Sequence, residues 1–427
     1  MNIVDLVCRI LIGAFGVFTA FRWFYMAVGL FARKKTYPET DQRFKYGILI
    51  CARNEEKVIG ALLDSIAGQD YPQELLTVFV MCDNCTDRTR EIAISKGAVA
   101  YTREDLKHNR KGYALEFLFA CIEEDFGSRC FDGYFVFDAD NLLDPRFISE
   151  MNKAFACGNK VVTGYRNSKN IETNVLSAGY GIHFFANTAC YHRPRAALGL
   201  GTHLTGTGYL FAADILENGW HFTNLTEDDE FTIFITSRAK KIAFCEDAEF
   251  FDEQPIDAGT AFRQRNRWAR GRIVAFVKHF REIVKFPLSS GTGFTGYDIF
   301  WHYFPVGLAT WVLGLIYPIT SIIVSLVTTG SVDVLEIVKT VLAAIASTYA
   351  FGLVTGIIAV IRERKHIRCG GFKLLFYLLM SPWFLLADTI HNIVAVFVDV
   401  KWTKIDHVDD RRIDDLIPPK GGENNVH

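Results

Sequence analysis

The ten residues Tyr134–Leu143, YFVFDADNLL, decide the fold of this chain. Tyr134–Phe137 are apolar and rich in β-forming side chains, which predicts a short buried strand. The strand ends at Asp138, Asp140 and Asn141. Open α/β sheets bind ligands at the carboxyl ends of their strands, and two carboxylates one residue apart at such an end suit Mg²⁺ or Mn²⁺ holding a diphosphate. A lone pair of this kind is more often a turn followed by a helix cap, so the other motifs decide between the two interpretations.

The composition indicates a membrane protein. The chain has 427 residues, half of which are hydrophobic, and 36 of them are Phe. This is too apolar for an ordinary soluble enzyme and predicts membrane-spanning segments. The net charge of −2 argues against nucleic acid as the main partner. Among the ten scattered cysteines, Cys82 and Cys85 lack the second pair that a zinc site needs, so we expect reduced cysteines in a cytosolic compartment.

The first 32 residues are expected to form a transmembrane anchor. Leu6–Phe31 is apolar and long enough to cross a bilayer, and only Arg9 and Arg22 interrupt it. No signal-peptide cleavage site follows. The basic cluster Arg33–Lys35 comes directly after the span, so the positive-inside rule predicts an external N-terminus and a cytoplasmic domain next.

Residues 33–286 are predicted to form that cytoplasmic domain, because strand and helix patterns alternate there. The predicted strands are Tyr46–Cys51, Thr77–Cys82, Val99–Tyr101, Tyr134–Phe137 and Val161–Tyr165. The predicted helices are Glu56–Gly68, Arg88–Ser95, Gly112–Phe126 and Pro145–Cys157. This alternation implies a mostly parallel sheet with helices on both faces.

Residues 287–400 are predicted to form interfacial and transmembrane helices. Phe304–Thr328 and Val334–Ile361 are expected spans. Phe372–Val400 is predicted to be a broken interfacial or re-entrant segment, because it contains four residues that are costly in lipid: Pro382, Asp388, His391 and Asn392. The tail, residues 401–427, is predicted to be cytoplasmic and, beyond Asp406, poorly ordered.

Polar clusters stand at strand and helix ends throughout the predicted domain. The five clusters are residues 52–56 (ARNEE), 83–87 (DNCTD), 110–112 (RKG), 138–141 (DADN) and 226–230 (TEDDE). Each alone is typical of a cap or a turn, and Thr226 is the expected cap of the last. All of them at one edge of one sheet indicate a nucleotide site, because that edge is where a nucleotide binds.

A sixth cluster, QRNRWAR at residues 264–270, is predicted to lie on a helix that enters the membrane interface. As a plain charged helix it would be a solvated face or the border of the next span. Trp268 beside Arg267 suits more than charge neutralisation, because an indole stacks against a sugar ring.

Together these motifs resemble the membrane-embedded family 2 glycosyltransferases of the cellulose, hyaluronan and exopolysaccharide synthase type. The matches, in family order, are ARNEE, DNCTD, RKGYAL (110–115), FDADN (137–141), GTG (206–208), TED (226–228) and QRNRW (264–268). They cover about Tyr46–Arg272, with the flanking spans in family position. The resemblance implies an α/β GT-A domain, Rossmann-like with a mostly parallel sheet, plus α-helical transmembrane segments.

The resemblance also implies an inverting transfer from a UDP-sugar and gives roles to particular residues. The uridine and its phosphates would contact Asn54, Glu55, Asp83 and Lys111. Asp138 and Asp140 would bind the diphosphate and Mg²⁺ or Mn²⁺, and Asp228 would be the general base on the acceptor hydroxyl. The remaining substrate contacts would come from Gly206, Thr207, Gly208, Gln264, Arg267 and Trp268.

Two further features are weaker. Residues 401–404, KWTK, loosely resemble the C-terminal gating motifs of this group, which makes Trp402 and Lys404 candidate substrate contacts. A Trp-Lys interfacial anchor explains them nearly as well. Four histidines have no metal-binding spacing and are expected to be loop or core residues, although one precedes GTG closely: His183, His192, His203 and His221.

These features predict a multi-pass enzyme of the plasma (inner) membrane that extends a β-linked polysaccharide from a UDP-sugar on the cytoplasmic side. One alternative is non-processive addition of a sugar to a lipid-linked acceptor, because so few spans make a channel doubtful unless the chain forms a homo-oligomer. Another is a catalytically inactive glycan-binding membrane protein, which the intact Asp138, Asp140 and Asp228 argue against. The expected partners are therefore a UDP-sugar, a glycan or lipid-linked acceptor, and membrane lipid.

Overall fold

An eight-stranded mixed sheet, in the order β3-β2-β1-β4-β7-β6-β8-β5, forms the centre of the molecule. The computed structural model describes residues 3–127, 130–216, 219–289, 291–330, 334–400, 403–405 and 407–417. The strands are β1 (Tyr46–Ala52), β2 (Leu76–Asp83), β3 (Val99–Arg103), β4 (Gly133–Asp138), β5 (Leu142–Leu143), β6 (Val161–Ser168), β7 (Tyr209–Ala212) and β8 (Ile242–Asp252). The α/β domain is thus confirmed, but its sheet is parallel only in two parts, across β3-β2-β1-β4 and between β6 and β8, because β7 and β5 run antiparallel to their neighbours.

Helices cover both faces of the sheet because its central strands are apolar on both sides. Ile48 and Phe135 pack on one face with α3 (Ile59–Ala67) and α6 (Phe147–Ala156), and Leu49 and Val136 pack on the other. The second face is covered by α5 (Lys111–Phe126) and α9 (Glu227–Ser237). The remaining helices of this region are α4 (Thr89–Ser95), α7 (Val175–Asn187), the π-helix η2 (Thr188–His192), α8 (Arg193–Ala197) and α10 (Ala258–Lys278).

The register brings the polar ends of three strands to one edge. Cys51 at the end of β1 lies opposite Asp138 of β4, and Ala52 lies opposite Cys82, the residue before Asp83. The motifs that follow these strands therefore meet at the carboxyl edge of the parallel part, as the sequence predicted.

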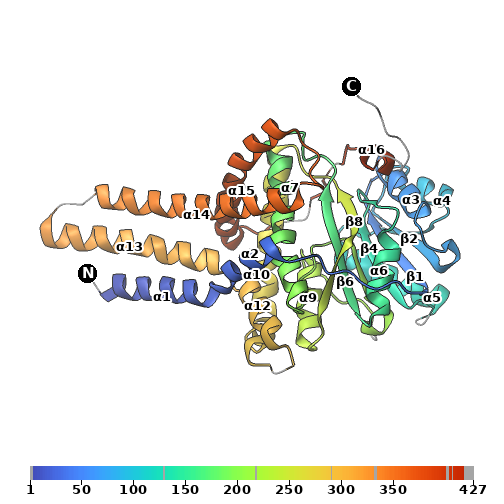
Figure 1. Cartoon of the computed structure of the whole chain (residues 1–427), viewed down its shortest axis with the longest axis horizontal. Helices are drawn as coiled ribbons and strands as arrows, with labels where there is room; N and C mark the ends of the chain where they lie inside the picture. The colour runs from blue at the N-terminus through green and yellow to red at the C-terminus, as the bar shows by residue number, and fades with distance from the viewer. Residues whose placement is uncertain are drawn as a thin grey trace.

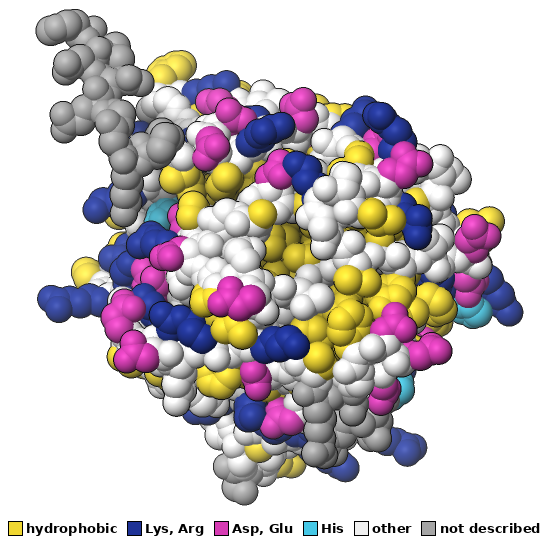
Figure 2. Space-filling view, turned by 90° about the vertical axis from the view of Figure 1, so that its right-hand side faces the viewer, with side chains coloured by type: hydrophobic (Ala, Val, Ile, Leu, Met, Phe, Trp, Pro, Cys, Tyr) yellow, Lys and Arg dark blue, Asp and Glu magenta, His cyan; other side chains and the backbone are white. Residues whose placement is uncertain are grey.

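Three apolar helices project from the sheet domain as an arm (Figure 1). They are α1 (Ile3–Thr19), α13 (Val306–Thr329) and α14 (Val334–Glu363). Many of their large apolar side chains are exposed, and Val327, at 81% exposure, is an extreme case. The segments Leu6–Phe31, Val306–Thr329, Ile337–Glu363 and Gly371–Phe397 are each long and apolar enough to cross a membrane. In contrast, acidic and basic side chains are interspersed over the face opposite the arm, as expected for a surface in water (Figure 2).

The predicted N-terminal segment, Leu6–Phe31, is long and apolar enough to be one membrane span, and it contains a break. It consists of two helices, α1 and α2 (Phe21–Phe31), which meet at Ala20. Arg22, two residues after the break, donates from its guanidinium to the carbonyl of Trp301 at 2.9 Å. The turn gives this cation a polar partner, which it would lack on a straight apolar helix in lipid.

The prediction of a broken segment at Phe372–Val400 is wrong, because α15 (Gly371–Phe397) is one continuous helix. Pro382 has no N–H for the carbonyl of Leu378, and the hydroxyl of Ser381 donates to that carbonyl instead, at 2.9 Å. The helix crosses the arm and packs beside α7 and α10 (Figure 1). Two of its polar residues contact protein side chains, since Asp388 pairs with Arg265 at 2.6 Å and His391 is hydrogen-bonded to the side chain of Asn266.

The tail also differs from the prediction, because residues 407–417 fold onto the sheet domain. The backbone N–H groups of Val408 and Asp409 donate to the carboxylate of Glu253. In the short helix α16 (Ile413–Leu416), Leu416 is buried against Leu142. The tail as a whole is polar, so its composition did not indicate docking. Three apolar residues nevertheless pack against the sheet domain: Ile413, Leu416 and Ile417.

Between the sheet domain and the arm, α11 (Phe280–Ile283) and α12 (Gly293–Tyr303) link α10 to α13. Tyr25 of α2 and Arg195 of α8 both hydrogen-bond to Asp298 of α12, with Arg195 using two nitrogens at 2.6 and 2.8 Å. This buried group ties α2 to α8 and α12 through a carboxylate whose charge is paired with Arg195.

Candidate active site

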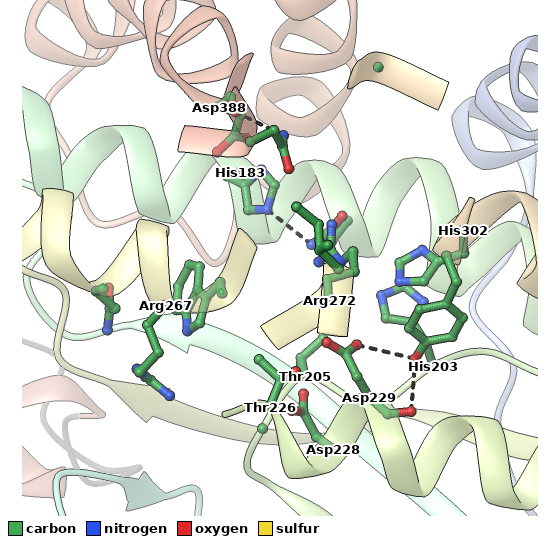
Figure 3. Close-up of a pocket in the computed structure, with 18 of the residues that line it drawn as sticks. His183, His203, Thr205, Thr226, Asp228, Asp229, Arg267, Arg272, His302 and Asp388 are labelled. Carbon is green, nitrogen blue, oxygen red and sulfur yellow. Dashed lines mark hydrogen bonds between the residues drawn. The ribbon is translucent and has the colours of Figure 1, made fainter. Parts of the chain in front are cut away.

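One cavity of about 1160 Å³ joins the carboxyl edge of the sheet to the helices of the arm. Its polar end is lined by Glu55, Asp83, Lys111, Asp138 and Asp140. Its middle is lined by residues of α7, α9, α10 and α12 (Figure 3). Its far end is lined mainly by apolar residues, Trp311, Leu315, Val341, Ala344 and Leu385, together with hydroxyl side chains such as Thr340 and Ser347. All six predicted clusters therefore open into one space, and the first does so through Arg53 and Glu55.

Lys111 connects three of the predicted motifs. Its ammonium donates to Asp138 at 2.5 Å and to the carbonyl of Gly206 at 2.8 Å, and it lies 3.7 Å from the carboxylate of Glu227. Burial alone would lower the pKa of Lys111, but the attraction of Asp138 and Glu227 outweighs it and raises that pKa. Lys111 is therefore a permanent cation at the place where a diphosphate would meet the sheet edge.

Asp140 is buried and stays ionised. Its carboxylate accepts a hydrogen bond from the backbone N–H of Glu253 at 2.9 Å. Burial would raise the pKa of Asp140, but the positive charges of His407 and Lys169 and this hydrogen bond lower it. Two carboxylates on the cavity wall, Asp138 and Asp140, supply hard oxygen ligands of the kind that Mg²⁺ or Mn²⁺ takes together with substrate phosphates. The described residues contain no cluster of three or more His, Cys, Asp or Glu side chains with metal-site geometry.

The GTG turn supports Asp138 from behind. Gly206 lines the cavity, whereas Thr207 is buried and accepts from the backbone N–H of Asp138 at 2.9 Å. Thr207 also donates to the side chain of Asn141. Gly208 has a φ of +68°, and a Cβ there would overlap the ring of Phe250. Of these three predicted substrate contacts, the structure therefore places Gly206 at the cavity and the other two behind it.

We expect Gly208→Ala to destabilise the fold by about 2–4 kcal/mol, because it adds overpacking to an unfavourable φ. Thermal unfolding of the purified protein measures the change. Gly199→Ala is the matched control, since Gly199 has nearly the same φ, +69°, but open space around it. Equal losses in the two variants would contradict the packing role of Gly208.

The three residues predicted to hold the uridine lie at the ends of β1 and β2. Asp83 is buried and receives a hydrogen bond from Arg103 at 2.6 Å, and its pKa is nevertheless raised, chiefly by burial. Glu55 lines the cavity, and its carboxylate contacts His407 of the tail at 3.1 Å. Asn54 instead braces the loop, because its side chain accepts from the backbone N–H of Thr86 at 2.7 Å.

The TED motif opens α9 and places Asp228 on the cavity wall (Figure 3). Thr226 occupies the cap position but makes no capping hydrogen bond, contrary to the prediction. Asp229 is hydrogen-bonded by the hydroxyl of Tyr303 at 3.1 Å. Burial, and then the charges of Asp229 and Glu227, raise the pKa of Asp228 well above its usual range. A carboxylate that binds a proton this readily is suited to general-base chemistry.

The predicted QRNRW helix is α10, and one side of it lines the cavity while the other contacts α15. Gln264, Arg267 and Trp268, at i, i+3 and i+4, all line the cavity. Arg265 and Asn266 face α15 instead. Arg267 donates to the carbonyl of Leu225 at 3.2 Å, one residue before TED. Trp268 packs edge-on against Tyr180 and Phe184 of α7, with ring centroids 5.8 and 6.5 Å apart.

The sequence comparisons match the part of the chain that builds this site. A sequence model of the family described as "Glycosyltransferase like family 2" matches residues 43–271. The chain belongs to this family. Its motifs and its geometry therefore describe a family 2 glycosyltransferase domain, with apolar helices on both sides of it.

Two curated relatives of this glycosyltransferase are similar over the same region. A β-monoglucosyldiacylglycerol synthase of Synechocystis is 26% identical over 245 residues, which is 56% of this chain and 50% of that protein. The probable glycosyltransferase YdaM of Bacillus subtilis is 25% identical over 56% of this chain and 58% of its own length. This chain therefore spans about half the length of the relatives it matches.

The fold is similar to that of a solved glycosyltransferase. The mannosyltransferase PcManGT of Pyrobaculum calidifontis, solved with GDP-mannose and Mn²⁺, matches with a TM-score of 0.55 at 16% identity, over 92% of this chain and 99% of that one. The likeness confirms the predicted fold class of a GT-A-like domain with added helices.

Some cavity residues were not predicted, and some predicted ones cannot be placed. Arg272 lines the cavity one turn after Trp268 and belongs to no recognised motif. His302 of α12 stacks on His203 with ring centroids 4.1 Å apart, which only the fold brings together. Lys404 lines the polar end of the cavity, and Trp402 lies outside the described residues.

Proposed function

We propose that this protein transfers a single sugar, with inversion, from a UDP-sugar to a hydroxyl of an amphiphilic lipid acceptor at the plasma membrane. The sheet domain would lie on the cytoplasmic side, and the arm helices would lie in the bilayer. The observation that carries the proposal is the single cavity whose polar end holds Lys111 and Asp138, whose middle holds Asp228 and Trp268, and whose far end is mainly apolar and lies among the arm helices.

The chemistry is one displacement. The acceptor oxygen forms a bond to the anomeric carbon while its proton passes to the carboxylate of Asp228. The bond between that carbon and the diphosphate oxygen breaks, and UDP leaves with the electron pair. Lys111 and Arg267 stabilise the negative charge that develops on the leaving diphosphate. Trp268 forms a platform that holds the acceptor in line.

A divalent metal fits the site. Asp138 and Asp140 supply two hard oxygen ligands, and the diphosphate and water would complete the coordination. When bound, the ion neutralises charge on the diphosphate. Lys111 already holds one oxygen of Asp138, so it positions this carboxylate before any ion arrives.

The apolar end of the cavity favours a lipid acceptor over a growing glycan. Trp311 and Leu315 of α13 and Val341 and Ala344 of α14 suit acyl chains better than a hydrated sugar chain. The β-monoglucosyldiacylglycerol synthases among the relatives have a lipid in the name of their product, which agrees with this acceptor class. Extension of a β-linked polysaccharide is the second candidate. It is favoured by the three residues of the QxxRW motif, which all line the cavity: Gln264, Arg267 and Trp268.

Product analysis decides between these functions. The purified full chain in nanodiscs would receive each of four donors, UDP-glucose, UDP-GlcNAc, UDP-galactose and UDP-glucuronate, with diacylglycerol or a β-linked oligosaccharide. We expect UDP release that depends on the lipid, and a product one sugar heavier than the acceptor by mass spectrometry. Products of many sugars would instead support the polysaccharide function. If none of the four donors releases UDP, the result would instead support a catalytically inactive glycan-binding protein.

We expect Asp140→Ala to weaken the binding of both Mn²⁺ and UDP by at least about tenfold, because it removes one of two protein ligands. Isothermal titration of the full chain with UDP, with and without Mn²⁺, measures both effects. Asp214→Ala is the control, since Asp214 pairs with Lys160 on the surface. Full transfer activity in excess EDTA would contradict the metal requirement.

A further inference from the structure

Arg272 is a cation of the cavity that the proposed reaction does not use. It lies on α10 four residues after Trp268 and eight after Gln264, so the three side chains form one stripe along the cavity wall. Arg267 lies five residues earlier and points to a different part of the cavity. Figure 3 shows Arg272 between His183 and His302, with Asp228 and Asp229 facing it from α9.

Three carboxylates of this region have other partners, whereas Asp228 faces Arg272 from α9 (Figure 3). Asp388 pairs with Arg265, and Asp298 is held by Arg195 and Tyr25. Asp229 attracts Arg272 through space, but its carboxylate accepts from the hydroxyl of Tyr303. Among the residues that the structure describes, Arg272 makes no hydrogen bond or ion pair.

Three arginines lie near His302 at this part of the cavity: Arg22, Arg195 and Arg272. Arg22 of α2 also lines the cavity, and within the described ranges of the chain it donates to the carbonyl of Trp301 and to no carboxylate. Burial, and then the positive charges of Arg272, Arg195 and Arg22, lower the pKa of His302 well below its usual range. Arg195 is paired with the carboxylate of Asp298, whereas Arg272 interacts with Asp229 only through space within the described part of the chain. The side chain of Arg272 is exposed to the cavity, so a ligand there can reach its guanidinium.

We propose that Arg272, supported by Arg22, binds an anionic phosphate group in the head of the acceptor, next to the hydroxyl that receives the sugar. The proposal rests on the proposed lipid acceptor and specifies its class as an anionic phospholipid with a free hydroxyl. A guanidinium fork matches two phosphate oxygens, whereas the imidazoles of His203 and His302 nearby are neutral. The phosphate is not consumed, because only the hydroxyl oxygen forms the new bond.

The test uses two acceptors with the same acyl chains, phosphatidylglycerol and diacylglycerol, in nanodiscs with the full chain and its best UDP-sugar. We expect kcat/KM to be at least about tenfold higher with phosphatidylglycerol. Arg272→Gln should lower kcat/KM for phosphatidylglycerol about 10–100-fold, the range expected for loss of a charge-assisted hydrogen bond, and for diacylglycerol less than about threefold. Arg263→Gln is the matched control, because Arg263 is exposed on the same helix and contacts Thr260.

Soluble competitors separate the lipid head group from free phosphate. sn-Glycerol 3-phosphate should inhibit competitively against phosphatidylglycerol in the wild type and weakly in Arg272→Gln, whereas glycerol should not inhibit. Inorganic phosphate inhibiting as well as glycerol phosphate would overturn the head-group assignment. Equal losses with both lipids in Arg272→Gln would overturn the proposal and make Arg272 a support for Asp229. Transfer to lipids without charge preference rejects this inference alone, while transfer only to oligosaccharides rejects the lipid acceptor itself.

Discussion

Asp228→Asn is expected to abolish sugar transfer while UDP-sugar binding survives. The carboxylate acts only on the acceptor proton, so its loss removes transition-state stabilisation without removing a donor contact. We expect turnover to fall by at least about 1000-fold, within the range for loss of a general base. Isothermal titration with UDP should give a dissociation constant within about twofold of the wild type.

The pH dependence supplies an independent check of this role. A base works only when it is ionised, and burial, followed by the charges of Asp229 and Glu227, raises the pKa of Asp228. Wild-type kcat/KM should therefore fall as the pH drops through this raised pKa, and the residual activity of Asp228→Asn should lack that limb.

The raised pKa of Asp228 also predicts how the stability of the fold depends on pH. A carboxyl with a raised folded-state pKa contributes stability below its unfolded pKa and loses that contribution as the pH rises through the folded pKa. Asp228→Asn should therefore unfold at the same temperature as the wild type or higher near pH 8, which excludes misfolding as the cause of inactivity. Near-wild-type turnover would move the base elsewhere, with Asp229 as the next residue to test.

The parts of the site that the sequence predicted are those built from short motifs at element ends. Asp138 and Asp83 are recognisable because an apolar run of β-formers stops just before each of them, and parallel register then brings them to one edge. Gln264, Arg267 and Trp268 share a face because helical spacing requires it. These inferences need only local periodicity and one rule of sheet topology.

The parts that the sequence did not predict depend on contacts between distant segments. The continuity of α15 through Pro382 depends on the hydroxyl of the neighbouring Ser381, which satisfies the carbonyl that proline leaves open. The docking of the tail depends on Leu142 offering an apolar surface to Leu416. The surroundings of Arg272 include His203 and His302, which are more than 90 residues apart in the chain and are brought together by α12. No local pattern encodes any of these three contacts.

Trp268→Ala should leave UDP-sugar binding intact and lower transfer by about 100-fold or more. The indole is wedged edge-on against Tyr180 and Phe184, so its orientation in the cavity is fixed by α7. A rigid platform positions the acceptor relative to Asp228, and positioning alone is worth about 7 kcal/mol or more of the barrier in favourable cases. Donor affinity by titration and turnover by UDP release would be measured in the same preparation.

Three variants distinguish a role of Trp268 in positioning the acceptor from a purely structural role. Trp268→Phe keeps an aromatic face and should retain part of the activity, whereas Trp383→Ala removes an exposed indole of α15 and should have little effect. Arg267→Lys should also lower turnover strongly, because a point charge does not replace a planar fork on the diphosphate. If Trp268 only fills space between α7 and α10, then Trp268→Ala will lower the unfolding temperature, donor affinity and turnover together. A loss confined to turnover, at an unchanged unfolding temperature, places the ring against the acceptor.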